Sequence, residues 1–508
     1  MPRRSILRRT RHKVIFIKLY LTYHIFPIYT GIPSLPSVRM PALSAALSSD
    51  AASVQSRQTP LPSGKELFRL ALPQAGLMLC HLVISMTDVW TTGRLGAEAQ
   101  AATGVVTQIF ALLMLLTSLI ASGCLTTVSQ SLGAGLEKRA NRYAGLILML
   151  SAVTGSVVAT AALMLAPLLF HVMSVSDGLR PALSTFFQAY CCQLPFYYML
   201  IMMNSIFRAY RKVFLPLLTL LVMMLANLIG DLGFGLGYFG FPAFGTAGVA
   251  WTTFACAVLG LGSNLALARH YGLLRRSTFA PWRWNRRAVP YLFRVGMPAA
   301  AGQIITHAGS LTTLVIIGLL PGSTDILAGM SVGGRVQGML MFPLAAVNMS
   351  VVILSGHLLG SGTRDGLYNF GRRTALRTGL MLLPPALLLY LLREPAASCF
   401  SADPSVLQQA STFLVFACLS IPFTAMTGMM NALFSGAGAT ILSCRIGAVT
   451  CWVVGIPLSL TLGPGLHFGA AGVYAAGTMA QIVAFLWTLR IFREKKWLEY
   501  GLRKRHTA

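Results

Sequence analysis

Charged residues are scarce in this sequence, and acidic residues are the scarcest of them. Asp, Glu, Lys and Arg make up 10% of the 508 residues, and only 13 residues are acidic, whereas soluble domains carry about 25% charged residues. The mean hydropathy is +0.68. A soluble protein of this length needs more charged residues to form its polar surface. The composition therefore predicts an integral membrane protein.

Several motifs that carry enzymatic chemistry are also missing. The sequence has no Gly-x-x-x-x-Gly-Lys phosphate-binding loop, no Asp-Asp-x-x-Asp motif for a metal-bound diphosphate, and no Cys-x-x-Cys pair among its nine cysteines. These absences argue against an ATP-driven pump and against a membrane-embedded prenyl or glycosyl transferase. We therefore expect no enzymatic activity, no cofactor and no bound metal apart from a coupling ion. We interpret the cysteines as small apolar packing residues.

Long apolar runs fill most of the chain. Each is close to the roughly 20 residues that a helix needs to cross about 30 Å of hydrocarbon, and none alternates polar and apolar residues as a barrel strand would. We predict an all-α integral membrane fold with twelve transmembrane helices. The predicted spans are 67–92, 104–132, 143–173, 181–207, 213–239, 245–268, 291–320, 326–359, 375–392, 404–434, 438–463 and 468–489.

The formal net charge of +27 is concentrated on one side of the predicted membrane. If both termini face the cytoplasm, the inner loops and the C-terminal tail hold most of the Lys and Arg, as the positive-inside rule requires. We therefore predict a multi-pass protein of the cell (inner) membrane with both termini cytoplasmic, and no nucleic-acid partner. The inner residues include Lys138, Arg139, Arg211, Arg275, Arg286, Arg372 and Arg445, whereas the outer loops hold Arg94, Arg180 and Arg393.

The first 62 residues differ from the rest of the chain. A basic cluster, "MPRRSILRRTRHK", precedes an apolar stretch that Lys18 and His24 interrupt, and no small-residue cleavage site precedes the Ser- and Ala-rich stretch 42–60. We expect residues 1–62 to form a cytoplasmic extension that is disordered or lies at the membrane interface. The alternative is that translation starts at Met40.

The two halves of the chain repeat each other. "LALPQAGLML" from residue 70 is echoed by "RVGMPAAAGQ" from residue 294, and "MNSIF" at 203–207 by "MNALF" at 430–434. Such a repeat of six helices predicts two pseudo-symmetric lobes related by an axis along the membrane normal, with a central cleft between them. The predicted divisions are an N-lobe at 63–272, an inter-lobe linker at 273–290, a C-lobe at 291–495 and a basic tail at 496–508.

Some of the repeated motifs resemble a known family. Pro73, Asp88 with "GRLG" (93–96), and "SQSLGAG" (129–135), repeated as Pro298 and "SGHLLGSG" (355–362), are similar to the multidrug and toxic compound extrusion (MATE) family of secondary transporters. The resemblance implies a monomeric antiporter in the lipid bilayer that exports amphipathic, often cationic, small molecules by alternating access. One loop departs from the family: "RAYRK" (208–212) has Ala209 and Arg211 where the family has glycines.

Two acidic residues are the strongest site candidates. Asp88 and Asp231 are the only carboxylates inside the predicted spans, and a mid-span carboxylate costs a few kcal/mol unless it faces a cavity. Asn227 lies one turn before Asp231 on the same helix face, and Thr252 on the sixth span offers a hydroxyl. We predict a role in ion coupling. The alternative for each acid is a hydrogen bond that only joins helices.

The DinF-type branch of the MATE family has a similar set of residues. The resemblance to that branch implies that Asp88, Asn227, Asp231 and Thr252 exchange protons or bind Na⁺, while the C-lobe, where Thr313 replaces Asp88, carries no coupling acid. We favour protons. Sodium stays open, because two carboxylates, an amide oxygen and a hydroxyl are the oxygen ligands that a hard cation prefers.

Weaker candidates could line a substrate cleft. Flexible thioethers and flat rings can repack around differently shaped substrates, and a histidine near Asp88 could share its proton. The competing function is a lipid-linked oligosaccharide flippase of the same superfamily, which would need several basic residues in its cleft. The cleft candidates are His81, His307, Arg335, Tyr198 and Met203.

Overall fold

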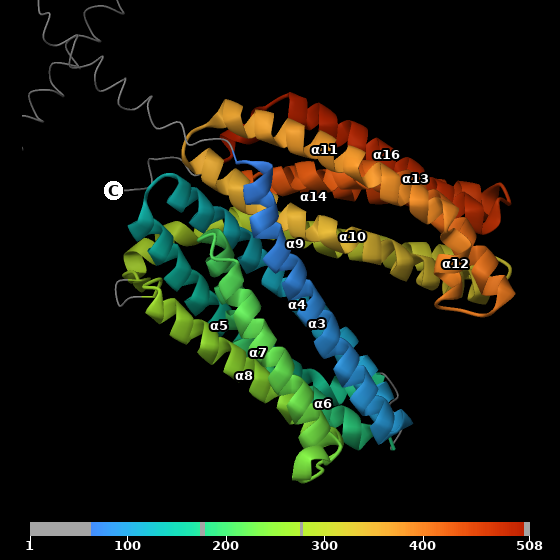
Figure 1. The fold of residues 1–508 in the computed structure, drawn as a ribbon, viewed down its shortest axis with the longest axis horizontal. Helices are drawn as coiled ribbons and strands as arrows, with labels where there is room; N and C mark the ends of the chain where they lie inside the picture. The colour runs from blue at the N-terminus through green and yellow to red at the C-terminus, as the bar shows by residue number, and fades with distance from the viewer. Residues whose placement is uncertain (1–61, 173–177, 275–277, 502–508) are drawn as a thin grey trace, which may run out of the picture. The chain divides into compact units, whose positions relative to one another are not determined.

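The computed structural model describes residues 62–172, 178–274 and 278–501. The predicted extension up to residue 61 and the alternative start at Met40 lie outside the described residues. Throughout the described ranges the chain forms helices and no strands. In Figure 1 the helices α3 to α8 gather in one bundle and α10 to α16 in another.

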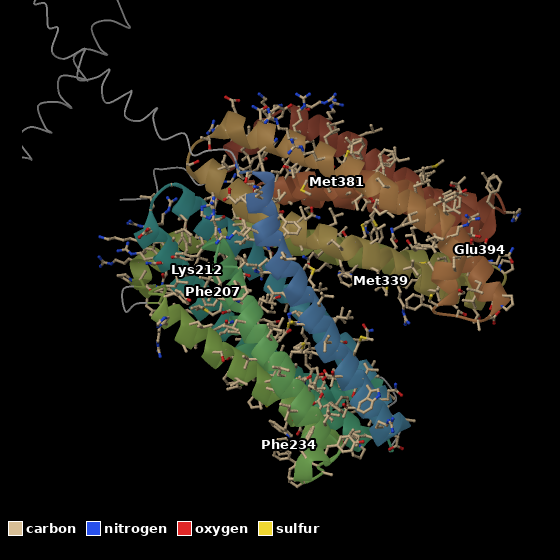
Figure 2. The ribbon with its side chains drawn as sticks, viewed as in Figure 1. Phe207, Lys212, Phe234, Met339, Met381 and Glu394 are labelled. Atoms are coloured by element: carbon tan, nitrogen blue, oxygen red, sulfur yellow. The ribbon has the colours of Figure 1, made fainter. Side chains whose placement is uncertain are left out.

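The N-lobe contains six long helical segments. The fifth, α7, continues into a short π-helix, η1. Figure 2 labels Lys212, just before α7, near one end of this bundle and Phe234, inside η1, near the other. The elements are α3 (Gly64–Leu95), α4 (Ala97–Gly133), α5 (Glu137–Val172), α6 (Arg180–Ala209), α7 (Phe214–Gly230), η1 (Asp231–Gly235), η2 (Tyr238–Gly240) and α8 (Thr246–His270).

The C-lobe repeats this plan with one added short helix, α12, that the sequence did not predict. Its fifth segment, residues 440–465, is a succession of α and π turns. The elements are α9 (Trp282–Gly318), α10 (Ser323–Gly360), α11 (Arg364–Leu391), α12 (Arg393–Ser398), α13 (Pro404–Ala437), α14 (Thr440–Ala448), η4 (Val449–Gly455), α15 (Ile456–Leu460), η5 (Thr461–Gly465), α16 (Gly469–Arg493) and η6 (Lys496–Glu499).

Eleven helical segments in the described ranges are long and apolar enough to cross a membrane. The other long helix, α6, has 30 residues and carries Gln188 and Gln193 among its apolar side chains. It is the fourth segment of the N-lobe, and with it the described chain has the twelve spans that the sequence predicted. The all-α, two-lobed fold class is confirmed.

Several helix ends are fixed by local capping. The Ser63 hydroxyl accepts a hydrogen bond from the Glu66 backbone N–H at the start of α3. Asp403 caps α13 in the same way, and hydrogen bonds from the Ser405 hydroxyl and backbone hold the pKa of Asp403 below its usual value. Pro404 follows at the first helical position, where its missing N–H has no cost.

The two lobes meet where α4 and α10 end, and their contacts follow the repeat. A Cβ atom on Gly133 would collide with the His357 carbonyl, and a Cβ atom on Gly360 would collide with the Gln130 carbonyl. Gly133 and Gly360 hold the same place in "QSLG" and "HLLG". Glycine at both positions therefore lets the two backbones touch.

Two hydrogen bonds across the same junction are also reciprocal. Gln130 Nε2 donates to the Gly436 carbonyl over 2.9 Å, and His357 Nε2 donates to the Ala209 carbonyl over 2.8 Å. The two donor residues are 227 positions apart in the sequence, and so are the two acceptor residues. Each lobe thus supplies one side-chain donor and one backbone acceptor at this end of the molecule.

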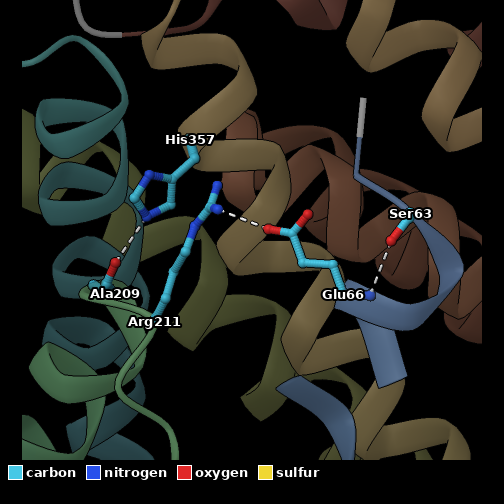
Figure 3. A network of polar contacts seen from close by, with 5 residues as sticks. All are labelled: Ser63, Glu66, Ala209, Arg211 and His357. Atoms are coloured by element: carbon cyan, nitrogen blue, oxygen red, sulfur yellow. Dashed lines mark hydrogen bonds and ion pairs between the residues drawn. The ribbon is translucent and has the colours of Figure 1, made fainter. Parts of the chain in front are cut away.

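The loop that departs from the family is explained by an ion pair. Figure 3 shows Arg211 beside the His357–Ala209 contact, with its guanidinium 2.7 Å from the Glu66 carboxylate. Arg211 has φ +58° and Gly438, its counterpart in the second repeat, has φ +83°. The first repeat therefore accepts a strained arginine at a glycine position, and that arginine ties the loop to the start of α3.

Candidate functional site

The two acids predicted inside the spans lie together in the N-lobe. Asp88 is on α3, and Asp231 is the first residue of η1, directly after α7. Their carboxyl groups lie near each other, and the Asn227 side chain lies beside that of Asp88, with no hydrogen bond between the three side chains. Asp231 is fully buried and Asp88 is partly exposed. The fold thus joins two acids that are 143 positions apart in the sequence.

A change of helix type sets the position of the second acid. The chain is α-helical up to Gly230, and the next five residues form the π-helix η1. The Asp231 backbone N–H still donates to the Asn227 carbonyl, so Asn227 and Asp231 stay on one face. Such π turns inside helices are frequent at functional sites because they alter the normal hydrogen-bond ladder.

Close packing of α8 on this turn brings Thr252 to the site. A Cβ atom on Gly230 would collide with the Thr252 side chain, and a Cβ atom on Gly248 would collide with the Phe234 carbonyl. The two glycines permit the approach of α8. Thr252 is buried beside Gly230, the residue that precedes Asp231. The four predicted coupling residues therefore come from three adjoining elements, α3, α7–η1 and α8.

A cavity of about 440 Å³ opens beside these residues. Helices α3, α4, α6, α7 and α8 all contribute to its wall. Asp88 and Asn227 are part of the wall, whereas Asp231 lies outside it. The volume is that of a small-molecule site. Other polar or aromatic residues of the wall are His81, Thr107, Gln108, Tyr190, Gln193 and Tyr197.

The polar atoms of the cluster are not satisfied by the protein. Five buried atoms of the cluster have no hydrogen-bond partner among the described residues: Oδ1 of Asp88, both carboxylate oxygens of Asp231, and both polar atoms of the Asn227 side chain. Buried polar groups without partners are costly. The arrangement favours a bound proton, cation or water in the midst of these atoms.

Of the weaker candidates, only His81 reaches this cavity. Tyr198 and Met203 are on α6, one of the helices that line the cavity, but both side chains are fully buried in packed clusters. The Tyr198 hydroxyl donates to the Leu113 carbonyl over 2.5 Å. These two residues pack helices and do not line the cavity, so we leave them out of the proposed site.

Two other candidates belong to the C-lobe. His307 on α9 and Arg335 on α10 are exposed and lie apart from the cavity. Thr313 lies on α9, and its hydroxyl donates to the Gly309 carbonyl of the same helix. At the C-lobe position that corresponds to Asp88, the side chain is thus a hydroxyl whose hydrogen bond is made within its own helix.

Three cavity residues on α6 were missed from sequence. Tyr190, Gln193 and Tyr197 line the same cavity as Asp88, and the Gln193 side chain has an unpartnered oxygen. The predicted Tyr198 is one residue from Tyr197, which corresponds to about 100° around a helix. Gln193 could have been found, because it is a buried amide in the middle of a predicted span.

No group of three or more His, Cys, Asp and Glu side chains that could hold a metal ion occurs in the described ranges. A Na⁺ ion does not need such a group, because backbone, amide and hydroxyl oxygens can complete its shell. The site is therefore suited to a proton or to a hard, oxygen-loving cation.

Comparison with known proteins identifies the family. A family model described as MatE matches residues 73–232 and 298–461, one segment in each repeat. The chain belongs to the MatE family. This is a family of membrane transporters, so the predicted MATE resemblance is confirmed, whereas assignment to the DinF-type branch stays a prediction.

Two of the relatives match over almost their whole length. The uncharacterized transporter YisQ of Bacillus subtilis is 24% identical over 441 residues, covering 86% of this chain and 95% of that protein. The probable multidrug resistance protein NorM of Thermotoga maritima is 23% identical over 438 residues, covering 85% and 93%. This chain is therefore similar to complete transporters.

The fold also matches solved structures. The crystal structure of the Vibrio cholerae MATE transporter VcmN in the bent form superposes with a TM-score of 0.76. The match covers 89% of this chain and all of that one, at 18% sequence identity. At this identity the match shows the fold alone.

Proposed function

We propose that this MATE transporter is a cation-coupled antiporter that exports amphipathic, often cationic, molecules by alternating access. The observation that carries the proposal is the meeting of Asp88 and Asp231 beside a cavity of the N-lobe. The multidrug-resistance name of the Thermotoga maritima relative supports the substrate class.

The chemistry of coupling follows from charge competition. When both carboxylates are ionised, they repel each other and attract a cationic substrate in the cavity. A proton or Na⁺ bound between Asp88 and Asp231 removes part of that charge and releases the substrate. Each monovalent ion that moves down a potential of 100 mV supplies about 2.3 kcal/mol, enough to drive a modest substrate gradient.

We favour protons as the coupling ion. A proton bound to one of two adjacent carboxyl groups lets that group donate a hydrogen bond and lowers the repulsion between the two. The Asn227 amide can donate to an ionised carboxylate and accept from a protonated one. Sodium is the alternative, and Asp88, Asn227, Asp231 and Thr252 would be its oxygen ligands.

The proposed topology follows from the loop charges. The basic loops that contain Lys138, Arg211 and Arg372 would face the cytoplasm, so both termini would lie there and the protein would act in the cell (inner) membrane as a monomer.

Transport in proteoliposomes tests the proposal. Ethidium movement is recorded while a pH gradient or a sodium gradient is imposed separately across vesicles that hold the full chain. We expect one gradient to drive export and D88N and D231N each to reduce it to background. Asp325, half-buried at the start of α10, supplies the control D325N, which should keep near-normal export. Full export by either acid variant would remove that residue from the mechanism.

The flippase alternative is tested in the same vesicles. A lipid-linked oligosaccharide flippase would move a fluorescent lipid-linked sugar between leaflets and would not respond to D88N or D231N. Ethidium export without any response to either ion gradient would contradict antiport.

A further inference from the structure

A second cavity does not include either member of the acid pair. It has a volume of about 600 Å³ and is bounded by the start of α3, the middle of α10 and the first half of α11. Met381 on α11, labelled in Figure 2, is part of its wall. We call this cavity the α3–α11 groove. Its wall is Pro62, Ser63, Gly64, Leu67, Phe68, Pro343, Leu344, Val347, Phe370, Arg373, Thr374, Arg377, Thr378, Met381 and Leu382.

One face of α11 gives the groove a polar edge. Arg373 and Arg377 are one helical turn apart and both are exposed. Thr374 and Thr378 lie beside them. Within the described residues, none of these four side chains has a hydrogen bond or an ion pair. Two cations and two hydroxyls therefore line one cavity without a partner from the protein.

The opposite walls of the groove are apolar. Leu67 and Phe68 of α3, Val347 of α10, and Met381 and Leu382 of α11 supply hydrocarbon and aromatic surface. Phe68 and Met381 are 65% and 76% exposed, which in a membrane span means exposed to lipid. The groove thus joins a cationic edge to an apolar wall.

The first turn of α3 adds to the positive edge. Ser63 and Gly64 bring the N-terminus of this 32-residue helix to the groove. The partial positive charge of a helix N-terminus favours an anion nearby. Glu66 in the same turn does not cancel it, because its carboxylate is paired with Arg211.

We propose that the α3–α11 groove binds an anionic glycerophospholipid. The phosphate lies between Arg373 and Arg377, where each guanidinium can donate two parallel hydrogen bonds to its oxygens. The Thr374 hydroxyl donates a further bond. The acyl chains run along Leu67, Phe68 and Met381 towards the lipid.

The occupant is a lipid because the apolar wall would have no partner if a free phosphate were bound. It is an anionic lipid because a zwitterionic headgroup would bring its own cation to the two arginines. Basic pockets between spans on the cytoplasmic side are the usual place for such headgroups. By the loop charges, Arg373 and Arg377 belong to that side.

The groove contains residues from both lobes, with α3 from the first and α10 and α11 from the second. A lipid that contacts all three helices binds best when they are arranged as in this structure. Its binding therefore stabilises this arrangement of the folded protein, and the stabilisation grows with the logarithm of the lipid concentration above Kd.

Lipid binding to the purified full chain tests the proposal. The protein in detergent is titrated with phosphatidylglycerol or with phosphatidylcholine of the same acyl chains, and bound lipid is counted by native mass spectrometry. We expect at least one phosphatidylglycerol to bind about tenfold more tightly than phosphatidylcholine, which corresponds to the loss of one charge-assisted hydrogen bond. The double variant R373Q/R377Q should remove this preference.

A matched control uses the same helix and the same loss of charge. Arg364 and Arg372 are also on α11 and exposed but lie outside the groove, so R364Q/R372Q should keep the preference. Thermal unfolding without lipid shows that both variants are folded. Equal affinity for the two lipids in the unchanged chain would overturn the proposal, as would an equal loss in both double variants.

Two further measurements identify the chemistry of the site. Soluble glycerol phosphate at millimolar concentration should not displace the lipid, since it lacks the acyl chains; displacement would show a phosphate site and overturn the lipid assignment. V347F, which narrows the apolar wall, should weaken phosphatidylglycerol binding severalfold while both arginines remain. Unchanged binding in V347F would show that the groove is not where the lipid lies.

Discussion

In the first repeat Asp88 and Asp231 meet between α3 and η1, whereas in the second repeat Thr313 takes the place of Asp88 and residues 449–460 contain no acid. The Thr313 hydroxyl bonds to its own helix, while five polar atoms of the first-repeat cluster have no partner in the described chain. One six-helix plan thus exists with and without buried charge. The second repeat therefore shows that a lobe of this plan forms without acids at these positions.

The two repeats also differ at the junction between the lobes, although most of the contacts there are equivalent in both. The Gln130–Gly436 and His357–Ala209 hydrogen bonds are equivalent in the repeat. Only the first repeat adds the Glu66–Arg211 ion pair, since Tyr291 stands in the place of Glu66 and lies near Gly438. The backbone contacts are therefore shared by the two repeats, and the ion pair is an addition to one of them.

The largest effect is expected when the first repeat is made like the second at Asp88. Asp88→Thr supplies the residue that α9 already carries at Thr313, so the helix should fold and the coupling charge should be lost. We expect gradient-driven ethidium export to fall to background with the thermal midpoint of unfolding nearly unchanged. Thr313→Val is the control and should keep full export. A collapse of stability in Asp88→Thr would show instead that the acid is structural.

Next in size is a test of the reciprocal glycine contact. Gly133→Leu and Gly360→Leu each force a side chain into the backbone of the other lobe, and such overpacking costs about 1–3 kcal/mol or more. Both variants should lower the thermal midpoint by a similar amount. Gly477→Leu, at a site with open space, is the matched control. If only one of the two junction variants were destabilised, the contact would not be symmetric.

A smaller effect is expected at the reciprocal hydrogen bonds. Gln130→Ala and His357→Ala each remove one donor, which is worth about 1 kcal/mol. Thermal unfolding in detergent should show similar losses for the two variants. If the loss of stability in the double variant equals the sum of the two single losses, the two hydrogen bonds are independent. A much larger loss in His357→Ala than in Gln130→Ala would contradict the equivalence of the two bonds.

The smallest effect is expected at the added ion pair. Arg211→Gly gives the first repeat the glycine of Gly438, which relieves about 1 kcal/mol of backbone strain and removes an ion pair worth about 0–1 kcal/mol at a surface. The two partners are 40% and 36% exposed, so the net change in unfolding free energy should be close to zero. Glu66→Gln should be mildly destabilising at low salt and neutral at high salt. Strong destabilisation in Arg211→Gly would contradict this balance.

Hydropathy and the internal repeat were sufficient to predict the spans and the two lobes, because lipid selects for long apolar runs. Helix ends outside the membrane were less visible: α11 begins at Arg364, eleven residues before the predicted span at 375–392, because "RDGLYNFGRR" is helical but polar. The short α12 and the π turns also left no signal in composition.

The acid pair could be singled out from the sequence because a carboxylate inside a membrane span is energetically costly. A carboxylate in an apolar run stands out, and Asn227 one turn from Asp231 follows from helix geometry. Tyr197 was missed in favour of Tyr198 because the rotation of α6 is set by packing and not by its own sequence. Arg373 and Arg377 became a candidate site only when the fold placed α3 beside α11.

The central claim is that a cation bound at Asp88 and Asp231 is exchanged for substrate, and ion release on substrate binding tests it most directly. Tetraphenylphosphonium is added to the purified full chain in weakly buffered detergent while protons are followed with a pH dye and sodium with an ion-selective electrode. We predict release of one ion species by the unchanged protein and none by D88N or D231N, with D325N behaving normally. Equal release by the unchanged protein and by both acid variants would contradict the account.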